Sequence, residues 1–422
     1  MLKKLSSRLS LLLLSVLLVT QAQAEIAASN IYTTVEKSVY QIRVINKQTG
    51  DKSSIGSGFV VGKDNILATN YHVVSEYIND PDLFQLEYLA TDGKKGPLEL
   101  IDFDIVHDLA VIKADKPMGA PLNIASLPPK GANLFSLGNP MDLGFTIVEG
   151  TNNGILAKAE DGNVLFSGSL NQGMSGGPTL NKEGNVIGVN VATSGNNISF
   201  LVSAEYLTVI LDRLKASNFK AVVDTFAHSS KQIKTSSKKI VNKILNNKWS
   251  NKRIGSLTVP ERLDKSIMCW DASRKPKKDD LLRSYLTTCS NRDNIYVSED
   301  LNIGTISYDY TWLETKDLGP TRFYRRYEKL NHSLMRSRAT KRDVTNFSCH
   351  TDFTNIASQD FKTTVCRRDY LKYEGLSDMM FTTAMVGKED KGFLFNLDFT
   401  GTDSKTALKL FTRMLETFKW EK

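Results

Sequence analysis

Hydrophobic residues between positions 31 and 214 occur in short runs, several of which alternate with polar residues, and Gly, Asn and Asp separate the runs. Short alternating runs with turn residues between them predict β-strands, and many such strands in succession predict an all-β barrel or sandwich. A region of this length is long enough for two small barrels. Residues 204–214 have apolar positions at helical spacing instead, and predict a closing amphipathic helix. The predicted strands include residues 39–44, 58–61, 66–69, 109–113, 134–137, 186–191 and 198–202.

The pattern changes after residue 215. Eight basic residues and no acidic residue lie between Lys231 and Arg253. We therefore expect residues 216–262 to form a basic helical linker that packs a narrow apolar stripe. Weak docking of residues 231–253 to an anionic membrane surface or an acidic partner is the alternative. Apolar residues recur at the spacing of a helix at Ile233, Ile240, Val241, Ile244 and Leu245.

The last region, residues 263–422, has aromatic-rich runs followed by one long amphipathic segment at 402–418, which predicts a final helix. This pattern is typical of an α+β domain, mostly an antiparallel sheet with a helix on it. The aromatic and basic segments 323–327 and 367–370 are interpreted as strands on the exposed face of that sheet, with ligand or partner binding as the alternative. The other predicted strands are residues 303–313, 361–366, 379–386 and 393–399.

All four cysteines lie in this last region. An even number of cysteines in an oxidising compartment predicts two disulfides, and four cysteines allow three pairings. We favour the sequential pairing, Cys269 with Cys289 and Cys349 with Cys366, because each bond closes a short local loop. Metal ligation is the rival interpretation, but the sequence has no close C-x-x-C pair. We expect no metal and no cofactor.

The first residues have the three parts of a secretory signal: basic residues at Lys3, Lys4 and Arg8, an apolar run at 11–19, and a small-x-small site at 22–24. We expect residues 1–24 to be a signal peptide, with an uncleaved anchor as the alternative, and the mature chain to reach the periplasm or the exterior. The formal net charge of +8 includes the three basic residues of this segment. The remaining charge is mild and does not indicate nucleic-acid binding.

The strongest chemical motif is Gly-Met-Ser-Gly-Gly-Pro at residues 173–178. A nucleophilic serine needs an exposed hydroxyl on a tight turn, with backbone N–H groups directed at the oxygen of the attacked carbonyl. Glycines permit such a backbone and leave the approach open. Ser175 is therefore the candidate nucleophile, and the N–H groups of Gly173 and Ser175 are the candidate oxyanion donors. A glycine-rich turn without chemistry is the alternative.

Two further motifs supply the partners that a nucleophilic serine requires. His72 follows the predicted strand 66–69, and Asp108 directly precedes the predicted strand 109–113. Serine is a poor nucleophile without an adjacent base, and the base needs an acceptor that fixes its tautomer. His72 and Asp108 fill these two roles, in the chain order His, Asp, Ser. His107 is a weaker candidate base because it lacks the preceding strand and turn.

Several blocks of the chain, taken in order, resemble the trypsin-like proteases of the bacterial HtrA (DegP/DegS) branch. The resemblance covers roughly residues 30–214 and implies a chymotrypsin-like domain of two perpendicular six-stranded β-barrels with a catalytic triad between them. His72 and Asp108 would come from the first barrel and Ser175 from the second. The blocks are residues 56–61, 68–74, 108–113, 138–140, 173–178 and 184–190.

Two departures from that family concern the regulation of the expected protease activity. We recognise no PDZ-like carboxylate-binding loop after residue 214, although such domains are usual in the family. Met174 stands where the family usually has Asn and where digestive relatives have Asp, and a methionine cannot form an ion pair with a newly cut N-terminus. Activation through such an ion pair is therefore not expected, and the sequence leaves open how the oxyanion turn is held.

The family layout places the pocket for the substrate side chain before the cleaved bond among residues 167–171 and the strands around residue 191. No Asp or Glu occurs at these positions, so we expect a small or medium apolar side chain there. The expected function is a secreted or periplasmic serine endopeptidase acting on proteins or peptides. A peptide-binding chaperone or regulatory pseudo-protease, whose C-terminal domain carries partner binding, is the alternative, and the oligomeric state is open. The expected pocket residues are Ser169, Val191, Ala192, Thr193 and Phe200.

Overall fold

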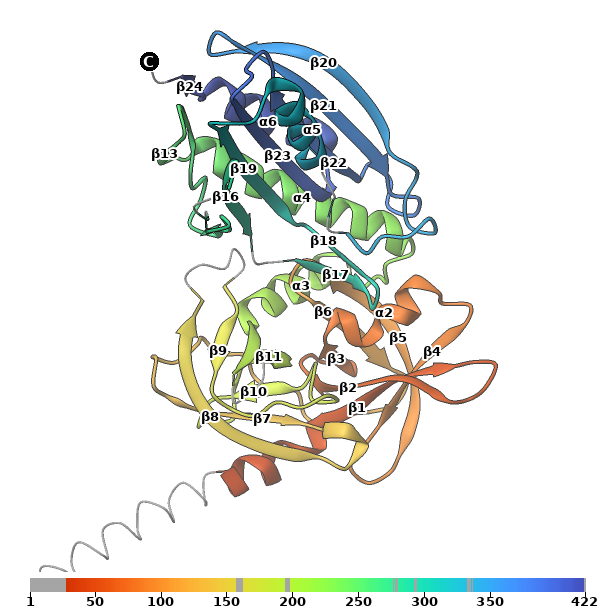
Figure 1. Cartoon of the computed structure of the whole chain (residues 1–422). Coiled ribbons are helices and arrows are strands. Elements are labelled where there is room, and N and C mark those ends of the chain that lie inside the picture. The colour runs from red at the N-terminus through yellow and green to blue at the C-terminus, as the bar shows by residue number, and fades with distance from the viewer. Residues whose placement is uncertain are drawn as a thin grey trace, which may run out of the picture. The chain divides into compact units, whose positions relative to one another are not determined.

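The computed structural model describes residues 28–156, 162–193, 198–275, 277, 280–291, 294–331, 335 and 337–420, so the predicted signal peptide lies outside the described residues. The chain divides into two compact units (Figure 1). The first comprises Met1–Leu156 and Gly162–Val222, and the second consists mainly of Val223–Lys422. Within the described part of the chain, no helix is long and apolar enough to cross a membrane.

The first unit begins with a closed barrel in the strand order β1-β2-β3-β6-β5-β4. Its strands bury apolar side chains, and residues such as Ile42, Phe59 and Val111 are fully buried. Closure pairs every strand on both sides, so this barrel has no edge strand. The strands are β1 (Val39–Asn46), β2 (Lys52–Val60), β3 (Ile66–Thr69), β4 (Phe84–Leu89), β5 (Lys95–Asp104) and β6 (Leu109–Ala114).

A second closed barrel follows, in the order β7-β8-β9-β12-β11-β10, which repeats the connectivity of the first. The prediction of a two-barrel, mainly β domain is therefore confirmed (Figure 1). The strands are β7 (Asn133–Gly138), β8 (Thr146–Ile155), β9 (Val164–Phe166), β10 (Pro178–Leu180), β11 (Val186–Thr193) and β12 (Ser199–Ser203).

Short helices complete the first unit. The predicted closing helix is α3 (Ala204–Ala216), which begins where the Ser203 side chain accepts from the Glu205 N–H. Arg213 of α3 donates from Nε to Asp102 Oδ2 at 2.7 Å, and this buried carboxylate ties the helix to β5. The others are a helix at 28–35, η1 (Glu36–Ser38), α2 (Tyr71–Asn79) and η2 (Pro140–Asp142).

The second unit is built on an open antiparallel sheet in the order β15-β16-β19-β23-β22-β21-β20. Two smaller sheets, β13-β14-β24 and β17-β18, accompany it. This confirms a further β-sheet domain with helices. The strands are β13 (Asn251–Ile254), β14 (Leu257–Pro260), β15 (Ile267–Asp271), β16 (Leu282–Asn291), β17 (Ile295–Ser298), β18 (Leu301–Ile303), β19 (Ile306–Thr315), β20 (Ser348–Ile356), β21 (Gln359–Asp369), β22 (Ser377–Met385), β23 (Lys391–Thr402) and β24 (Lys419–Trp420).

Helices pack on both faces of this sheet (Figure 1). Helices α4 (Thr225–Asn246) and α6 (Ser404–Glu416) share one aromatic core with the sheet, in which Phe381 stacks on Phe411 at 4.4 Å between ring centroids. Helix α5 (Pro320–Leu330) packs on the opposite face. Neighbouring residues of β19 divide between the two cores, because successive side chains of a strand point to opposite faces. Trp312 belongs to the first core and Leu313 to the second.

The segment predicted as a linker belongs to the second unit, which starts at Val223. Val241 and Ile244 of α4 are buried in the core of that unit, with Ile240 and Leu245 packed beside them. Asp264 also anchors the helix, because it accepts from Lys243 Nζ at 3.2 Å and from Asn247 Nδ2 at 2.7 Å. The apolar stripe is therefore the one predicted, but it packs into a domain core and the structural boundary lies near residue 222.

The strand interpretation of residues 323–327 is wrong, because these residues lie in helix α5. Phe323 and Tyr327 are four residues apart, so both reach the same helical face and are buried against the sheet. Pro320 stands in the first turn, where its missing N–H costs no hydrogen bond. Residues 367–369 do belong to a strand, β21.

Both predicted disulfides are present in the sequential pairing. Cys269 lies directly opposite Cys289 across β15 and β16, and Cys349 directly opposite Cys366 across β20 and β21. These two strand pairs are the two edges of the seven-stranded sheet. Each disulfide therefore joins an edge strand to its neighbour.

Candidate active site

The structure brings His72 and Asp108 into direct contact. Asp108 Oδ2 lies 2.7 Å from His72 Nδ1, and Asp108 Oδ1 accepts from the backbone N–H of His72 at 2.8 Å. Both carboxylate oxygens of Asp108 thus contact His72. The contact with Nδ1 places a proton on that nitrogen, which leaves Nε2 as the basic nitrogen of the neutral ring.

Local structure explains why these two side chains meet. His72 is the second residue of α2, where a backbone N–H has no partner within the helix, and Asp108 supplies the acceptor. Asp108 directly precedes β6 with a backbone φ of +55°, an unusual conformation that Asp tolerates better than most residues. Its carbonyl oxygen accepts from Asn70 Nδ2 at 2.7 Å, which fixes the turn.

The surroundings of His72 raise the pKa of its side chain. Burial lowers the pKa of His72, but the charge of Asp108 and its hydrogen bond raise it by more, so the net pKa lies above the ordinary value of 6.5. The His72 side chain remains 26% exposed. The ring therefore keeps a second proton to a higher pH than a free imidazole does.

Ser175 lies on a tight turn whose glycines make close backbone contacts. Gly173 has a φ of +92°, and a Cβ there would lie 2.4 Å from Asn139 O. Gly176 has a φ of +83°, and a Cβ there would lie 2.3 Å from Thr69 Oγ1 and 3.0 Å from the backbone N of Asn70. Only glycine fits at either position. The second contact sets the nucleophile turn against the residues that directly precede α2 and His72.

Two buried residues that the sequence analysis did not single out hold this turn. Ser57 of β2 donates its hydroxyl to Gly173 O at 2.7 Å, and its N–H donates to Ser175 O at 2.7 Å. Asn190 of β11 donates from Nδ2 to Met174 O at 3.2 Å, and its backbone carbonyl accepts from the Gly176 N–H. Each lies inside a family-like sequence block, which was the available signal for them.

Met174 is fully buried, in a core cluster with Leu134, Leu170 and Ile187 of the second barrel. Burying a methionine side chain contributes about 1.5–3 kcal/mol. The turn is therefore held by apolar burial at the position where digestive relatives use an ion pair. This answers part of the question that the sequence left open.

The Ser175 hydroxyl donates to the backbone carbonyl of Val191 at 2.8 Å. A proton directed at this carbonyl is not directed at His72. Rotation about the Cβ–Oγ bond or about χ1 can redirect this hydroxyl.

The predicted pocket residues lie on adjoining elements. Ala192 of β11 pairs with Phe200 of β12, and Val191 precedes Ala192 on the same strand. The Ser199 hydroxyl donates to Gly168 O at 2.7 Å, which ties the turn containing the exposed Ser169 to β12. The side chains of Ala192 and Thr193 lie outside the described residues.

His107 has its own carboxylate partner. Its Nδ1 lies 2.7 Å from Asp104 Oδ2, and its ring stacks on Tyr206 at 3.8 Å between centroids. Burial raises the pKa of Asp104, but hydrogen bonding and the charge of His107 lower it by more. Nothing in these contacts resembles a base for Ser175. In the described part of the chain, no group of three or more His, Cys, Asp or Glu residues is placed to hold a metal ion.

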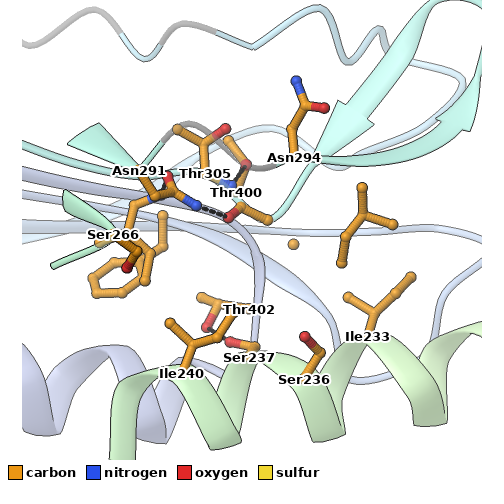
Figure 2. A pocket seen from close by; sticks show the side chains of 15 residues that line it. Ile233, Ser236, Ser237, Ile240, Ser266, Asn291, Asn294, Thr305, Thr400 and Thr402 are labelled. Atoms are coloured by element: carbon orange, nitrogen blue, oxygen red, sulfur yellow. Dashed lines mark hydrogen bonds between the residues drawn. The ribbon is translucent and has the colours of Figure 1, made fainter. Parts of the chain in front are cut away.

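A hollow in the second unit has a different character (Figure 2). Helix α4 and the strand ends around residues 305 and 400 line it with hydroxyl, amide and aliphatic groups. Asn291 bridges its wall by donating to Gly304 O and accepting from the Ile306 N–H. Its lining contains no ionisable side chain, so it offers neither a base nor a nucleophile with a base beside it.

Comparison with known proteins finds a family model and several relatives that resemble part of this chain. Residues 56–189 match the family model of the trypsin-like peptidase domain. The chain is 31% identical over 178 residues to the mitochondrial serine protease HTRA2 of Drosophila virilis, covering 40% of this chain and 41% of the relative.

Two bacterial relatives show the same range of similarity. The serine endoprotease DegS of Escherichia coli (strain K12) is 30% identical over 177 residues, which cover 38% of this chain and 48% of DegS. A probable periplasmic DegP-like serine endoprotease of Brucella suis biovar 1 (strain 1330) is 32% identical over 172 residues, covering 38% of this chain and 32% of the relative. The chain thus spans less than half the length of these relatives, and its match to the trypsin-like peptidase domain lies within residues 56–189.

Proposed function

We propose that this protein is an exported serine endopeptidase in which Ser175 is the nucleophile, His72 the general base and Asp108 the residue that orients the base. The observation that carries the proposal is the doubly hydrogen-bonded pair of Asp108 and His72, which leaves Nε2 as the basic nitrogen. The match of residues 56–189 to the trypsin-like peptidase domain supports it.

The proposed reaction follows from these groups. His72 Nε2 takes the proton of Ser175 as Oγ attacks the peptide carbonyl carbon, and the carbonyl oxygen becomes an oxyanion. When the tetrahedral intermediate collapses, His72 gives the proton to the leaving amine and an acyl-enzyme remains. Water then attacks the ester, with His72 again accepting a proton. When this second intermediate collapses, the bond to Ser175 Oγ breaks, His72 returns the proton to Oγ, and the acid product leaves.

The N–H groups of Gly173 and Ser175 are proposed to stabilise the oxyanion. Both N–H groups belong to a turn whose carbonyls are fixed by Ser57 and Asn190, so they need no reorganisation when charge develops. Loss of one such donor typically lowers the rate by about 100- to 1,000-fold.

For the side chain before the cleaved bond, we propose a small or medium apolar residue such as Val, Ala or Leu. Support comes from the uncharged character of Ser169, Val191 and Phe200, since a basic side chain would need a carboxylate partner. Cleavage-site profiling with a peptide library tests this, and a profile dominated by Lys or Arg would contradict it.

The experiment that tests the main proposal compares the full-length wild type with Ser175→Ala. Wild type is expected to release acid-soluble peptides from casein and to be labelled by a fluorophosphonate probe. Ser175→Ala should fold normally but lose both properties. Casein hydrolysis by the variant at the wild-type rate would refute the assignment.

A peptide-binding protein without turnover is the second candidate, and the hydrogen bond from Ser175 Oγ to Val191 O favours it. A wild-type protein that binds casein but is neither labelled nor active would support this candidate.

The proposed weak attraction of the α4 region to anionic membranes is limited by internal pairing: Lys238 lies 3.7 Å from Asp403 and Lys243 3.2 Å from Asp264. Sedimentation with anionic vesicles measures the membrane binding that remains.

A further inference from the structure

The loop at residues 139–144 contacts the nucleophile turn at the peptide unit that carries one proposed oxyanion donor. The backbone N–H of Met141 donates to Gln172 O at 2.8 Å. The carbonyl and N–H of a trans peptide unit point in opposite directions. This bond therefore turns the N–H of Gly173 away from the loop, and any shift of Met141 would release that orientation.

The loop has an unfavourable backbone conformation. Met141 has a φ of +50° and Asp142 a φ of +60°, and left-handed conformations cost non-glycine residues about 1–2 kcal/mol each. Burial of apolar side chains offsets little of this cost, since Pro140 is buried but Met141 is 56% exposed and Leu143 78% exposed. Polar contacts must therefore hold the loop in place.

The strongest of these contacts converge on the carboxylate of Asp142. Its Oδ1 accepts from Gln41 Nε2 at 2.8 Å, its Oδ2 is bound by Lys52 Nζ, and the Arg43 guanidinium lies 3.8 Å away. Arg43 also orients Gln41, by donating from Nε to Gln41 Oε1. All three partners belong to β1 and β2, in the closed wall of the first barrel.

Asp142 is charged under working conditions. Hydrogen bonds, first from Lys52 and then from Gln41, lower the pKa of its carboxyl below the ordinary value of 3.8. The contacts also differ from an ordinary surface ion pair, because Gln41 is fully buried and Arg43 is only 15% exposed. A rigid, partly desolvated set of donors loses less entropy on binding than two free surface side chains.

We propose that Asp142 is a positioning residue: its contacts with β1 and β2 hold the loop at 139–144 so that Met141 directs the Gly173 N–H toward the oxyanion. The inference rests on the proposed function. A structural role alone predicts that removal of the carboxylate lowers stability without a specific effect on turnover. A positioning role predicts a loss in kcat with little change in KM.

The test uses the full-length protein and two variants. Asp142→Asn keeps the size and the tolerance of a positive φ but removes the charge, and Asp142→Gly relieves the backbone strain while removing the carboxylate. For both, we expect kcat on a casein-derived peptide and the rate of fluorophosphonate labelling to fall about 10- to 100-fold, within the effect of losing one oxyanion donor. KM should stay within about twofold, as expected when an interaction of the transition state alone is lost.

The matched control is Asp92→Asn. Asp92 pairs with Lys94 at 2.7 Å in an exposed turn of the same barrel, so its loss changes charge equally without touching the loop, and activity should be unchanged. Lys52→Met should reproduce the loss, and Lys52→Met combined with Asp142→Asn should add nothing to it. Wild-type turnover and labelling in both Asp142 variants would overturn the inference while leaving the proposed function intact.

A second measurement decides the inference even if the wild type has no peptidase activity, in which case the proposed function fails by itself. Amide hydrogen exchange of a peptide spanning residues 171–176 should be at least about tenfold faster in both Asp142 variants than in wild type and Asp92→Asn, because the loop at 139–144 no longer holds the turn in place. Unchanged exchange in this segment would overturn the inference.

Discussion

The two units of this protein solve the same problem of β-sheet structure in different ways. The first closes its sheets into two barrels, so that no strand edge is left, and it contains none of the four cysteines. The second leaves its seven-stranded sheet open and joins each edge strand to its neighbour by a disulfide. Closure protects backbone groups by pairing them, whereas an open sheet needs its edges reinforced.

The two units also differ in the side chains that they bury. The first unit buries polar side chains such as Ser57, Asn70 and Asn190 near the turn that contains Ser175, and hydrogen bonds from Ser57 and Asn190 hold backbone carbonyls of that turn. The second unit buries a large aromatic core that includes Phe381 and Phe411. We therefore expect substitutions of single polar residues to affect the proposed activity of the first unit. Loss of disulfides or core contacts should instead lower the stability of the second unit.

The largest effect is expected for Asp108→Asn, which should lower kcat/KM by about 10⁴-fold while leaving the second unit unchanged. In wild type, both oxygens of Asp108 accept from His72. In the variant, the single oxygen remains on the backbone N–H and the amide donates to Nδ1. The ring proton then moves to Nε2, which can no longer act as the base. Kinetics on a cleaved peptide measure this, and a loss below about tenfold would contradict the tautomer argument.

Removal of the Cys349–Cys366 bond tests the role of the cross-links. Strand β20 is exposed at eight of its nine residues, so packing contributes little to holding it. Cys349→Ala with Cys366→Ala should lower the stability of the second unit by about 3 kcal/mol, from the entropy of the opened loop. Calorimetry measures the shift, and peptidase activity should be unchanged.

The matched comparison is the other disulfide. Cys289 is buried in the aromatic core, so Cys269→Ala with Cys289→Ala should cost more, through a cavity in addition to the open loop. Equal and negligible costs at both sites would break the proposed contrast between the units.

A smaller effect is expected at Asp264, which holds α4 to the second unit. Burial raises its pKa, but hydrogen bonds from Ser266 and Lys243 outweigh this and lower the pKa to about 2. The carboxylate therefore stabilises the fold above pH 3.8 and loses that contribution as pH falls toward 2. Asp264→Asn should reduce stability at neutral pH by about 1–2 kcal/mol, and the difference from wild type should vanish in acid. Urea titrations at several pH values measure this.

The smallest predicted effect concerns the pH dependence of the first unit. Because Asp108 raises the pKa of His72 and the neutral ring is the base, kcat/KM should rise with pH through a pKa above 6.5. Peptidase assays over a series of pH values measure this rise. An acidic limb centred below 6.5 would show that burial, not the carboxylate, dominates at this histidine.

Local sequence was sufficient for features whose determinants lie within a few residues. The turn at 173–178, the strand before His72 and the pairing of nearby cysteines are of this kind. Phe323 and Tyr327 were misread because a short aromatic run fits a strand as well as a helix, and only packing on the sheet distinguishes the two.

Other features depend on contacts between distant segments and could not be predicted. Asp142 meets Gln41 and Lys52 about a hundred positions away, and Ser57 meets Gly173 across the first unit. Nothing in the neighbourhood of these residues signals their partners. For α4 the sequence predicted the apolar stripe correctly, but not that the stripe would be covered by the second unit.

One further consequence concerns the tryptophans. All four occur in the second unit, at residues 249, 270, 312 and 420, and Trp312 is buried in its core beside Trp420. Indole emission excited selectively is therefore an intrinsic optical signal of that unit alone. A change in emission during denaturation, reduction or substrate addition can be assigned to the second unit without a label, while the proposed peptidase activity reports independently on the first.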